Sequence, residues 1–294
     1  MSLSKLFPPR TVLAVANNVA VRSLSAQSQA QSDLKPYSEI PGLKGLPVVG
    51  AVHKLTAKPH GYERFPLNLL KYQEEISNGT GLLRMDSKVV SNMEGSDGRA
   101  LWVFKPELVE AVIRAEGKYP NRGEFFGSLR LWKLSRPDIF LGNTGVLLEE
   151  GEKWQEIRSK VQQDMMRPKS AMHYIEPLEQ VVEEFFEYVD RELAATPDKA
   201  TIENFTPDLY KYALEAIVMI ALDRKLGAFE ENLTEETAEM IRHVKSMFEA
   251  LGEVQLGIPV HKISPILSPS FRRLCKHLDG CAAFIHVTLH NLHN

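Results

Sequence analysis

The 294-residue sequence lacks several features that would classify it at once. It has only two cysteines, which excludes a disulfide framework. Its 35 basic and 38 acidic residues give a net charge of −3, which excludes a strongly basic nucleic-acid-binding protein. No P-loop, G-x-G-x-x-G or G-x-S-x-G motif occurs, so the common nucleotide-binding and serine hydrolase patterns are missing.

Acidic residues are absent from residues 1–32. This segment holds Lys5, Arg10 and Arg22 and a tract rich in serine, glutamine and alanine. Such a composition is typical of a mitochondrial transit peptide, and R-S-L-S at 22–25 has the form of a processing site. The apolar stretch 11–21 is too short to span a bilayer, which argues against an N-terminal membrane anchor. A plain disordered tail is the simpler alternative.

Prolines and glycines crowd residues 33–50. They exclude both a helix and a continuous strand there, and we expect a hinge, marked by Pro36, Pro41, Gly42, Gly45, Pro47 and Gly50. Residues 51–294 are then expected to form one domain, with ample length for a core.

Apolar spacing in residues 51–294 predicts a mainly α fold with a small N-terminal β-sheet. We expect a helix at 65–76, strands at 82–86 and 100–104, a helix at 107–116 and an irregular loop at 120–141. Almost all of the later chain is predicted to be helical. In one helix an apolar stripe should face the core: Ile175, Leu178, Val182, Phe185, Phe186, Val189 and Leu193.

Trp154 and Arg158 are four residues apart in a predicted helix. This spacing places an indole N–H and a guanidinium on one face, one turn apart. Both groups only donate hydrogen bonds, so together they suit an anion such as a carboxylate. An ordinary surface Trp–Arg cation–π pair would explain the spacing equally well.

The residues around this pair form a longer ordered string. Residues 145–169 spell G-V-L-L-E-E-G-E-K-W-Q-E-I-R-S-K-V-Q-Q-D-M-M-R-P-K. The string resembles the C-helix region of the cytochrome P-450 superfamily, the haem-thiolate monooxygenases, and its ending is most similar to the mitochondrial branch. The hinge I-P-G-L-K-G-L-P-V-V-G at 40–50 also resembles that family. The resemblance implies that Trp154 and Arg158 bind a haem propionate.

The resemblance implies a fold and a function for the chain. The fold would be the N-terminal part of the cytochrome P-450 fold, truncated before the haem-thiolate loop, so the axial cysteine would be absent. The parent activity would be hydroxylation of a hydrophobic, steroid-like substrate, with electrons from a ferredoxin-type donor. The protein would lie in mitochondria, peripheral to the inner membrane, and this incomplete chain would be inactive alone. The alternative is a non-catalytic α-helical interaction protein.

Two further segments gain an expected role from the family. The apolar loop 120–141 would be a substrate-recognition segment, with Phe125, Phe126, Leu131, Trp132 and Phe140 at the pocket, although about half of such residues would pack on the core in any case. Residues 256–269 combine three prolines with an apolar composition and would contact the membrane surface.

Three patterns resemble functional motifs but have simpler explanations. Glu239 and Arg242 spell E-x-x-R, which an exposed (i, i+3) ion pair explains. His286, His290 and His293 could share one helix face, yet no further ligand stands close by in the sequence. Neither Cys275 nor Cys281 stands in the F-x-x-G-x-x-x-C-x-G pattern of the family's haem-thiolate loop, and we expect them to be small buried helix residues.

Overall fold

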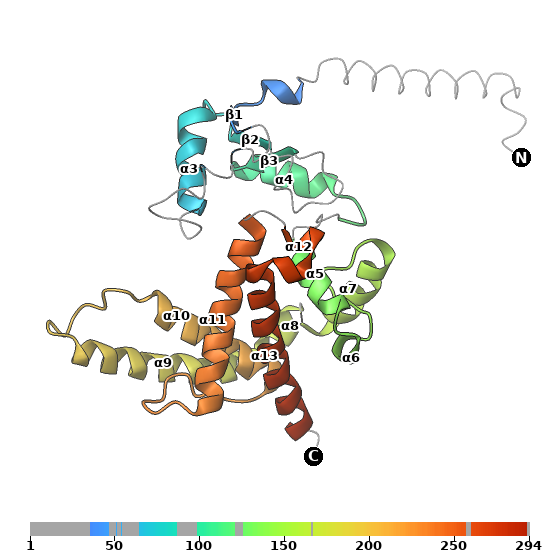
Figure 1. Cartoon of the computed structure of the whole chain (residues 1–294). Coiled ribbons are helices and arrows are strands. Elements are labelled where there is room, and N and C mark those ends of the chain that lie inside the picture. The colour runs from blue at the N-terminus through green and yellow to red at the C-terminus, as the bar shows by residue number, and fades with distance from the viewer. Residues whose placement is uncertain are drawn as a thin grey trace, which may run out of the picture.

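The computed structural model describes residues 36–46, 51, 54, 65–86, 99–120, 126–165, 167–256 and 260–292. The predicted transit peptide, residues 1–32, lies outside the described residues, whereas residues 36–46 of the predicted hinge are described and hold a short 3₁₀ turn and a two-residue strand. The architecture is mainly α with a small N-terminal β-sheet, as predicted. The sheet and two helices lie together at one end of the molecule, and the longer helices lie at the other (Figure 1).

The small sheet has three strands in the order β1 (Gly42–Leu43), β2 (Leu82–Asp86) and β3 (Arg99–Val103). β1 is parallel to β2, and β2 is antiparallel to β3, with Leu83 opposite Trp102. Alternate side chains of β2 point inward, so Leu83 and Met85 are buried against helix α3 (Phe65–Ile76). A 3₁₀ turn, η2 (Tyr37–Glu39), precedes the sheet, and α4 (Pro106–Ala115) follows it.

The segment 120–141 is not the irregular loop that the sequence predicted. It contains α5 (Gly127–Leu134) and α6 (Pro137–Phe140). α5 is amphipathic, since Ser128 and Trp132, one turn apart, are both buried. Pro137 begins α6, and Leu141 ends it in the left-handed conformation with φ 51°. These helices are only eight and four residues long, too short for apolar periodicity to reveal them.

Helix α7 (Gly151–Met165) carries the predicted Trp–Arg pair and leads into the short α8 (Pro168–Ala171) and η4 (Met172–Tyr174). Two antiparallel neighbours follow, α9 (Ile175–Ala195) and α10 (Thr206–Leu222), which pack through Phe185, Tyr188 and Met219. The apolar stripe predicted for α9 is wrong at two positions, Ile175 (44% exposed) and Phe186. Phe186 is 64% exposed, whereas Tyr188 is buried, because α10 covers only one side of the stripe.

The longest helices, α11 (Glu235–Leu256) and α13 (Pro269–Leu292), run side by side (Figure 1). They share a buried cluster that includes Ala250, Val254 and Leu274. Between them lie α12 (Val260–Ile263) and η5 (Pro265–Leu267), so the proline-rich segment does break the two helices as predicted. None of the helices in the described ranges is both long and apolar enough to cross a bilayer.

Candidate functional site

The start of α7 is fixed by a buried carboxylate just before the helix. Glu149 accepts hydrogen bonds at Oε1 from the Thr144 backbone N–H (3.0 Å) and the Thr144 hydroxyl (2.7 Å). Lys153, in the first turn of α7, lies 3.0 Å from the same oxygen. Burial raises the pKa of Glu149, but the bonds from Thr144 and the Lys153 contact outweigh it and hold the pKa at about 2. Glu149 therefore stays ionised and orients α7.

Trp154 and Arg158 both lie on α7 and are half-buried, as the four-residue spacing predicted. The other cations of this helix are neutralised locally: Lys153 pairs with Glu149, and Lys160 pairs with Glu156 at 2.7 Å. Arg158 differs, because its side chain makes no ion pair or hydrogen bond within the described part of the chain. A half-buried guanidinium without an acid is costly unless an anionic ligand compensates for its lost hydration.

Arg158 borders a surface hollow of about 420 Å³, which we call the α7 hollow. Its other lining residues are Gln162, Gln163 and Arg167, so two cations and two amides, and no acid among the described side chains, surround it. The two guanidinium groups only donate, and the amides can donate as well, so this set fits a carboxylate or another oxyanion.

The residues predicted for a substrate pocket divide into three groups. Phe125 lies outside the described residues. Phe126 is half-buried just before α5, and Leu131 is 41% exposed on that helix. Trp132 and Phe140 meet edge-to-face with ring centroids 5.1 Å apart. Trp132 is buried among side chains of α11 and α13 and is therefore part of the hydrophobic core.

A polar link that the sequence did not reveal holds α5 and α6 against α13. The Trp132 indole N–H donates to Asp279 Oδ1 at 2.9 Å, and the Arg136 guanidinium donates to the same oxygen. Arg136 also pairs with Asp138 at 2.9 Å. Asp279 lies more than 140 residues away from both donors in the chain, and no spacing rule connects positions so distant.

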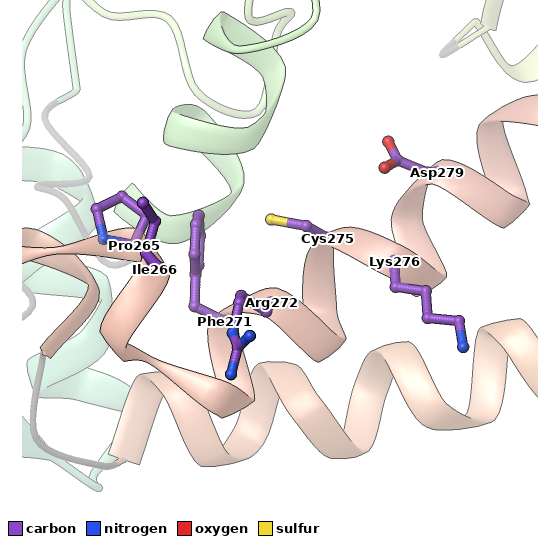
Figure 2. Close-up of a pocket in the computed structure, with 7 residues that line it drawn as sticks. All are labelled: Pro265, Ile266, Phe271, Arg272, Cys275, Lys276 and Asp279. Carbon is purple, nitrogen blue, oxygen red and sulfur yellow. The ribbon is translucent and has the colours of Figure 1, made fainter.

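A second hollow, of about 450 Å³, lies along the start of α13, and we call it the α13 hollow. Figure 2 shows Phe271 and Cys275 between the η5 residues Pro265 and Ile266 and the more distant Asp279. Beside it, the η5 and α12 side chains Ile263, Ile266 and Leu267 are 87, 76 and 69% exposed. Apolar side chains this exposed, grouped within one short segment, are typical of a surface that meets another apolar phase.

Neither cysteine suits the role of an axial thiolate. Both are half-buried on α13. Burial raises the pKa of Cys275 to about 11, assisted by the negative charge of Asp279, and burial raises the pKa of Cys281 to about 11 as well. Both thiols are therefore protonated at neutral pH in the haem-free chain, and both lie within a regular helix rather than in a loop.

The fold and the α7 geometry define a mainly helical chain with a small N-terminal sheet, in which Trp154 and Arg158 share one helix beside the α7 hollow. The sequence profile of the cytochrome P-450 family matches residues 88–292. The chain belongs to the cytochrome P-450 family, whose cofactor is haem.

Several curated proteins are similar to the chain. Probable cytochrome P-450 49a1 of Drosophila melanogaster is 28% identical over 94% of this chain and 45% of its own length. Probable cytochrome P-450 301a1, mitochondrial, of the same organism is 26% identical over 91% of this chain and 46% of its own length. The mitochondrial sterol 26-hydroxylase of Rattus norvegicus is 30% identical over 62% of this chain and 33% of that protein. The chain thus spans about half the length, or less, of these relatives.

Proposed function

We propose that α7 holds one propionate of a haem through Trp154 and Arg158. The observation that carries this proposal is the half-buried Arg158, which has no acidic partner in the described residues and lies beside a hollow lined by a second arginine and two amides. A propionate would supply the missing charge, and a guanidinium can bind both of its oxygens. Trp154 lies one turn away on the same face and would pack against or donate to the same group.

The whole protein would be a haem monooxygenase that hydroxylates a hydrophobic substrate with electrons from a ferredoxin-type donor. Haem supplies the oxygen-activating chemistry when it is bound. From this chain, the segment that contains Phe125, Phe126, Leu131, Trp132 and Phe140 would border the substrate. The sterol 26-hydroxylases among the relatives support a steroid-like substrate by their names.

The 294 residues on their own would not catalyse this reaction. Cys275 and Cys281 are protonated helix residues, and neither has backbone positioned to wrap a thiolate. Haem added to the purified chain, reduced and exposed to carbon monoxide, should give no thiolate-type Soret band. Such a band together with turnover would contradict the proposal, because it would require one of these two sulfurs as the axial ligand.

Two features support a mitochondrial and membrane-peripheral location. Residues 1–32 have basic residues without acids, and the relatives include proteins named as mitochondrial. The exposed Ile263, Ile266 and Leu267, in the segment 256–269, would insert shallowly into a lipid surface. A reporter fused to residues 1–32 should enter mitochondria; a reporter that stays cytosolic or is secreted would contradict the localisation.

The direct test of the haem proposal uses a form of this protein that also carries a haem-ligating segment. Titration with haem, followed by Soret absorbance, should show one site per chain and a thiolate-type carbon monoxide complex. No haem binding by such a form would instead favour the second candidate, a non-catalytic α-helical interaction protein.

A further inference from the structure

A pair of histidines joins α11 to α13 away from the α7 site. His243 Nδ1 lies 3.2 Å from His277 Nδ1, and the ring centroids are 5.1 Å apart with planes at 66°. His277 is only 7% exposed. The two residues come from the two helices with the most extensive mutual packing in the described chain. A polar pair at this place can therefore affect how firmly these helices hold together.

Gly280 makes room for this pair. A Cβ atom at position 280 would come within 2.2 Å of the His243 ring, closer than any real contact allows. Gly280 lies inside α13, where glycine costs helix stability by roughly 1 kcal/mol relative to alanine. The absence of a side chain there allows the His243 ring to lie against α13 and to reach His277.

The surroundings define which ring nitrogens carry protons. Arg242 Nη2 lies 3.2 Å from His243 Nε2, and because a guanidinium can only donate, His243 Nε2 must accept. The proton of a neutral His243 is then on Nδ1, and it is donated to His277 Nδ1. His277 in turn carries its proton on Nε2. Both rings are neutral in this arrangement, and His243 is the less common Nδ1–H tautomer.

The charges that face the pair are mostly positive. α11 contributes Arg242, which also pairs with Glu239 at 3.2 Å. α13 contributes Lys276 and Arg273, the latter paired with Glu253 of α11 at 2.5 Å. α10 contacts α13 through the apolar cluster of Leu214, Val218 and Phe284 and brings no charge to the pair through it. Burial first, then the neighbouring His243, and then Arg242, Lys276 and Arg273 lower the pKa of His277 below its ordinary 6.5.

We propose that the His243–His277 pair is a proton-sensitive latch between α11 and α13, closed when both rings are neutral and released when acid adds a proton to His277. A proton on His277 Nδ1 removes the acceptor for His243 and places a positive charge beside Arg242, Lys276 and Arg273. Opening of this helix pair would also loosen the exposed segment 256–269 between the helices and the Asp279 contact with Trp132. Protonation of His277 would thus loosen both the segment 256–269 and the α5–α13 contact through the loss of one hydrogen bond.

The direction of the pH effect follows from the neutral state of the pair. His277 binds a proton more readily in the opened state than in the closed one, so the latch is at full strength above pH 6.5 and weakens as pH falls below it. Between pH 7.5 and pH 5.0 the opening equilibrium should increase by up to about thirtyfold, the proton-binding factor of one histidine with an ordinary pKa of about 6.5. The buried His261 also has a lowered pKa, so its protonation also destabilises the fold in acid. This contribution is the same in the wild type and the His277 variant and cancels when the two are compared.

The test measures amide hydrogen-exchange protection of α11 and α13 in the full 294-residue chain at pH 7.5 and 5.0, corrected for intrinsic exchange rates. His277→Asn keeps an acceptor near the Nδ1 position but does not titrate, so the acid-induced loss of protection should fall by up to about thirtyfold. His286→Asn, an exposed histidine of the same helix, is the matched control and should respond like the wild type. A His277→Asn variant with the full wild-type response would overturn the proposal.

Two further measurements keep the proposal testable if that variant is unstable. Nitrogen-15 spectra of the wild-type histidines at pH 7.5 should show His243 as the Nδ1–H tautomer; an Nε2–H tautomer would overturn the proposal. Gly280→Ala should displace the His243 ring and lower α13 protection already at pH 7.5, and its further response to acid should be smaller than that of the wild type. An unchanged tautomer and pH response in Gly280→Ala would also overturn it.

Discussion

Two arginines show how the polar groups of α7 differ from those that join α5 and α6 to α13. The Arg136 side chain, 30% exposed, pairs with Asp138 and with Asp279 of α13, so its charge is neutralised within the protein. Arg158 is half-buried on α7 and has no such partner in the part of the chain that the structure describes. One arginine joins elements of the fold, and the other borders a hollow whose remaining described lining residues are Gln162, Gln163 and Arg167.

The comparison distinguishes polar residues that bond to other parts of the fold from Arg158, which we propose binds a ligand. In the α11–α13 region, Asp279 bonds to Trp132 and Arg136, and His243 bonds to His277, so these polar groups have partners within the protein. On α7, Lys153 pairs with Glu149 and Lys160 pairs with Glu156, whereas Arg158 has no acidic partner among the described residues. Substitutions in the first region should therefore change folding stability, and substitutions at Arg158 should change ligand binding.

The largest expected effect is in the core shared by α11 and α13. Leu274→Ala removes a side chain with no exposed surface and should lower the free energy of unfolding by about 2–5 kcal/mol. Val287→Ala, at a half-exposed position of the same helix, should cost less than about 0.5 kcal/mol. Urea denaturation of both variants measures the difference. Equal losses would mean that the α11–α13 contact is not a stabilising core.

A smaller effect is expected from the buried carboxylate of α10. Glu215 is 1% exposed and accepts hydrogen bonds from the backbone N–H groups of Leu226 (2.7 Å) and Ala228 (2.7 Å). Glu215→Ala leaves these buried donors without their acceptor, so it should cost about 1–3 kcal/mol of unfolding free energy. Glu187→Ala on the exposed face of α9 is the control, and a similar loss there would refute the capping role of Glu215.

A still smaller effect is expected from the link between α5 and α13. Asp279→Ala removes the acceptor of Trp132 and a partner of Arg136, and should cost about 1 kcal/mol because the carboxylate is 45% exposed. The Trp132 fluorescence should change with it, since the indole loses its hydrogen bond. Asp138→Ala, which also contacts Arg136 but not Trp132, should leave that fluorescence unchanged. If both variants behaved alike, Asp279 would not hold Trp132.

Long periodic helices and the α7 string could be predicted from the sequence, whereas tertiary partners could not. The predicted bounds of α3, β2 and α4 agree with the structure to within one residue. Their apolar spacing and the helix-starting Pro106 are local signals that the sequence shows directly. Phe186 was predicted to be buried but is exposed. The apolar stripe of α9 is wider than the face that α10 covers, and the sequence does not show which side of the stripe is covered. α5 and α6 were missed because they are too short for periodicity.

For the candidate site, the sequence predicted that Trp154 and Arg158 share a helix, but not how they are supported. The prediction that they bind a haem propionate came from the resemblance of residues 145–169 to the cytochrome P-450 family. The Glu149–Thr144 bonds that begin α7 join residues five apart in a turn, and no capping pattern marks them. The links between Asp279 and Trp132 and between His243 and His277 connect segments that only the folded chain brings together.

The measurement that tests the central claim most directly is haem dissociation from a form of this protein that carries a haem-ligating segment. Loss of a charged hydrogen bond to a half-buried anion is worth about 1.5–3 kcal/mol, so Arg158→Ala should release haem about 10–100 times faster than the wild type. Arg158→Lys should lie between them because it keeps the charge but not the planar donor.

Lys160→Ala on the same helix is the control and should release haem at the wild-type rate, since Lys160 is exposed and paired with Glu156. In the 294-residue chain, Arg158→Ala should change the free energy of unfolding by less than about 0.5 kcal/mol, because Arg158 joins no described elements. Faster haem release with unchanged folding stability is the result that this account predicts. If Arg158→Ala kept haem as firmly as the wild type, the Trp154–Arg158 pair would be an ordinary surface pair and the proposed propionate site would be wrong.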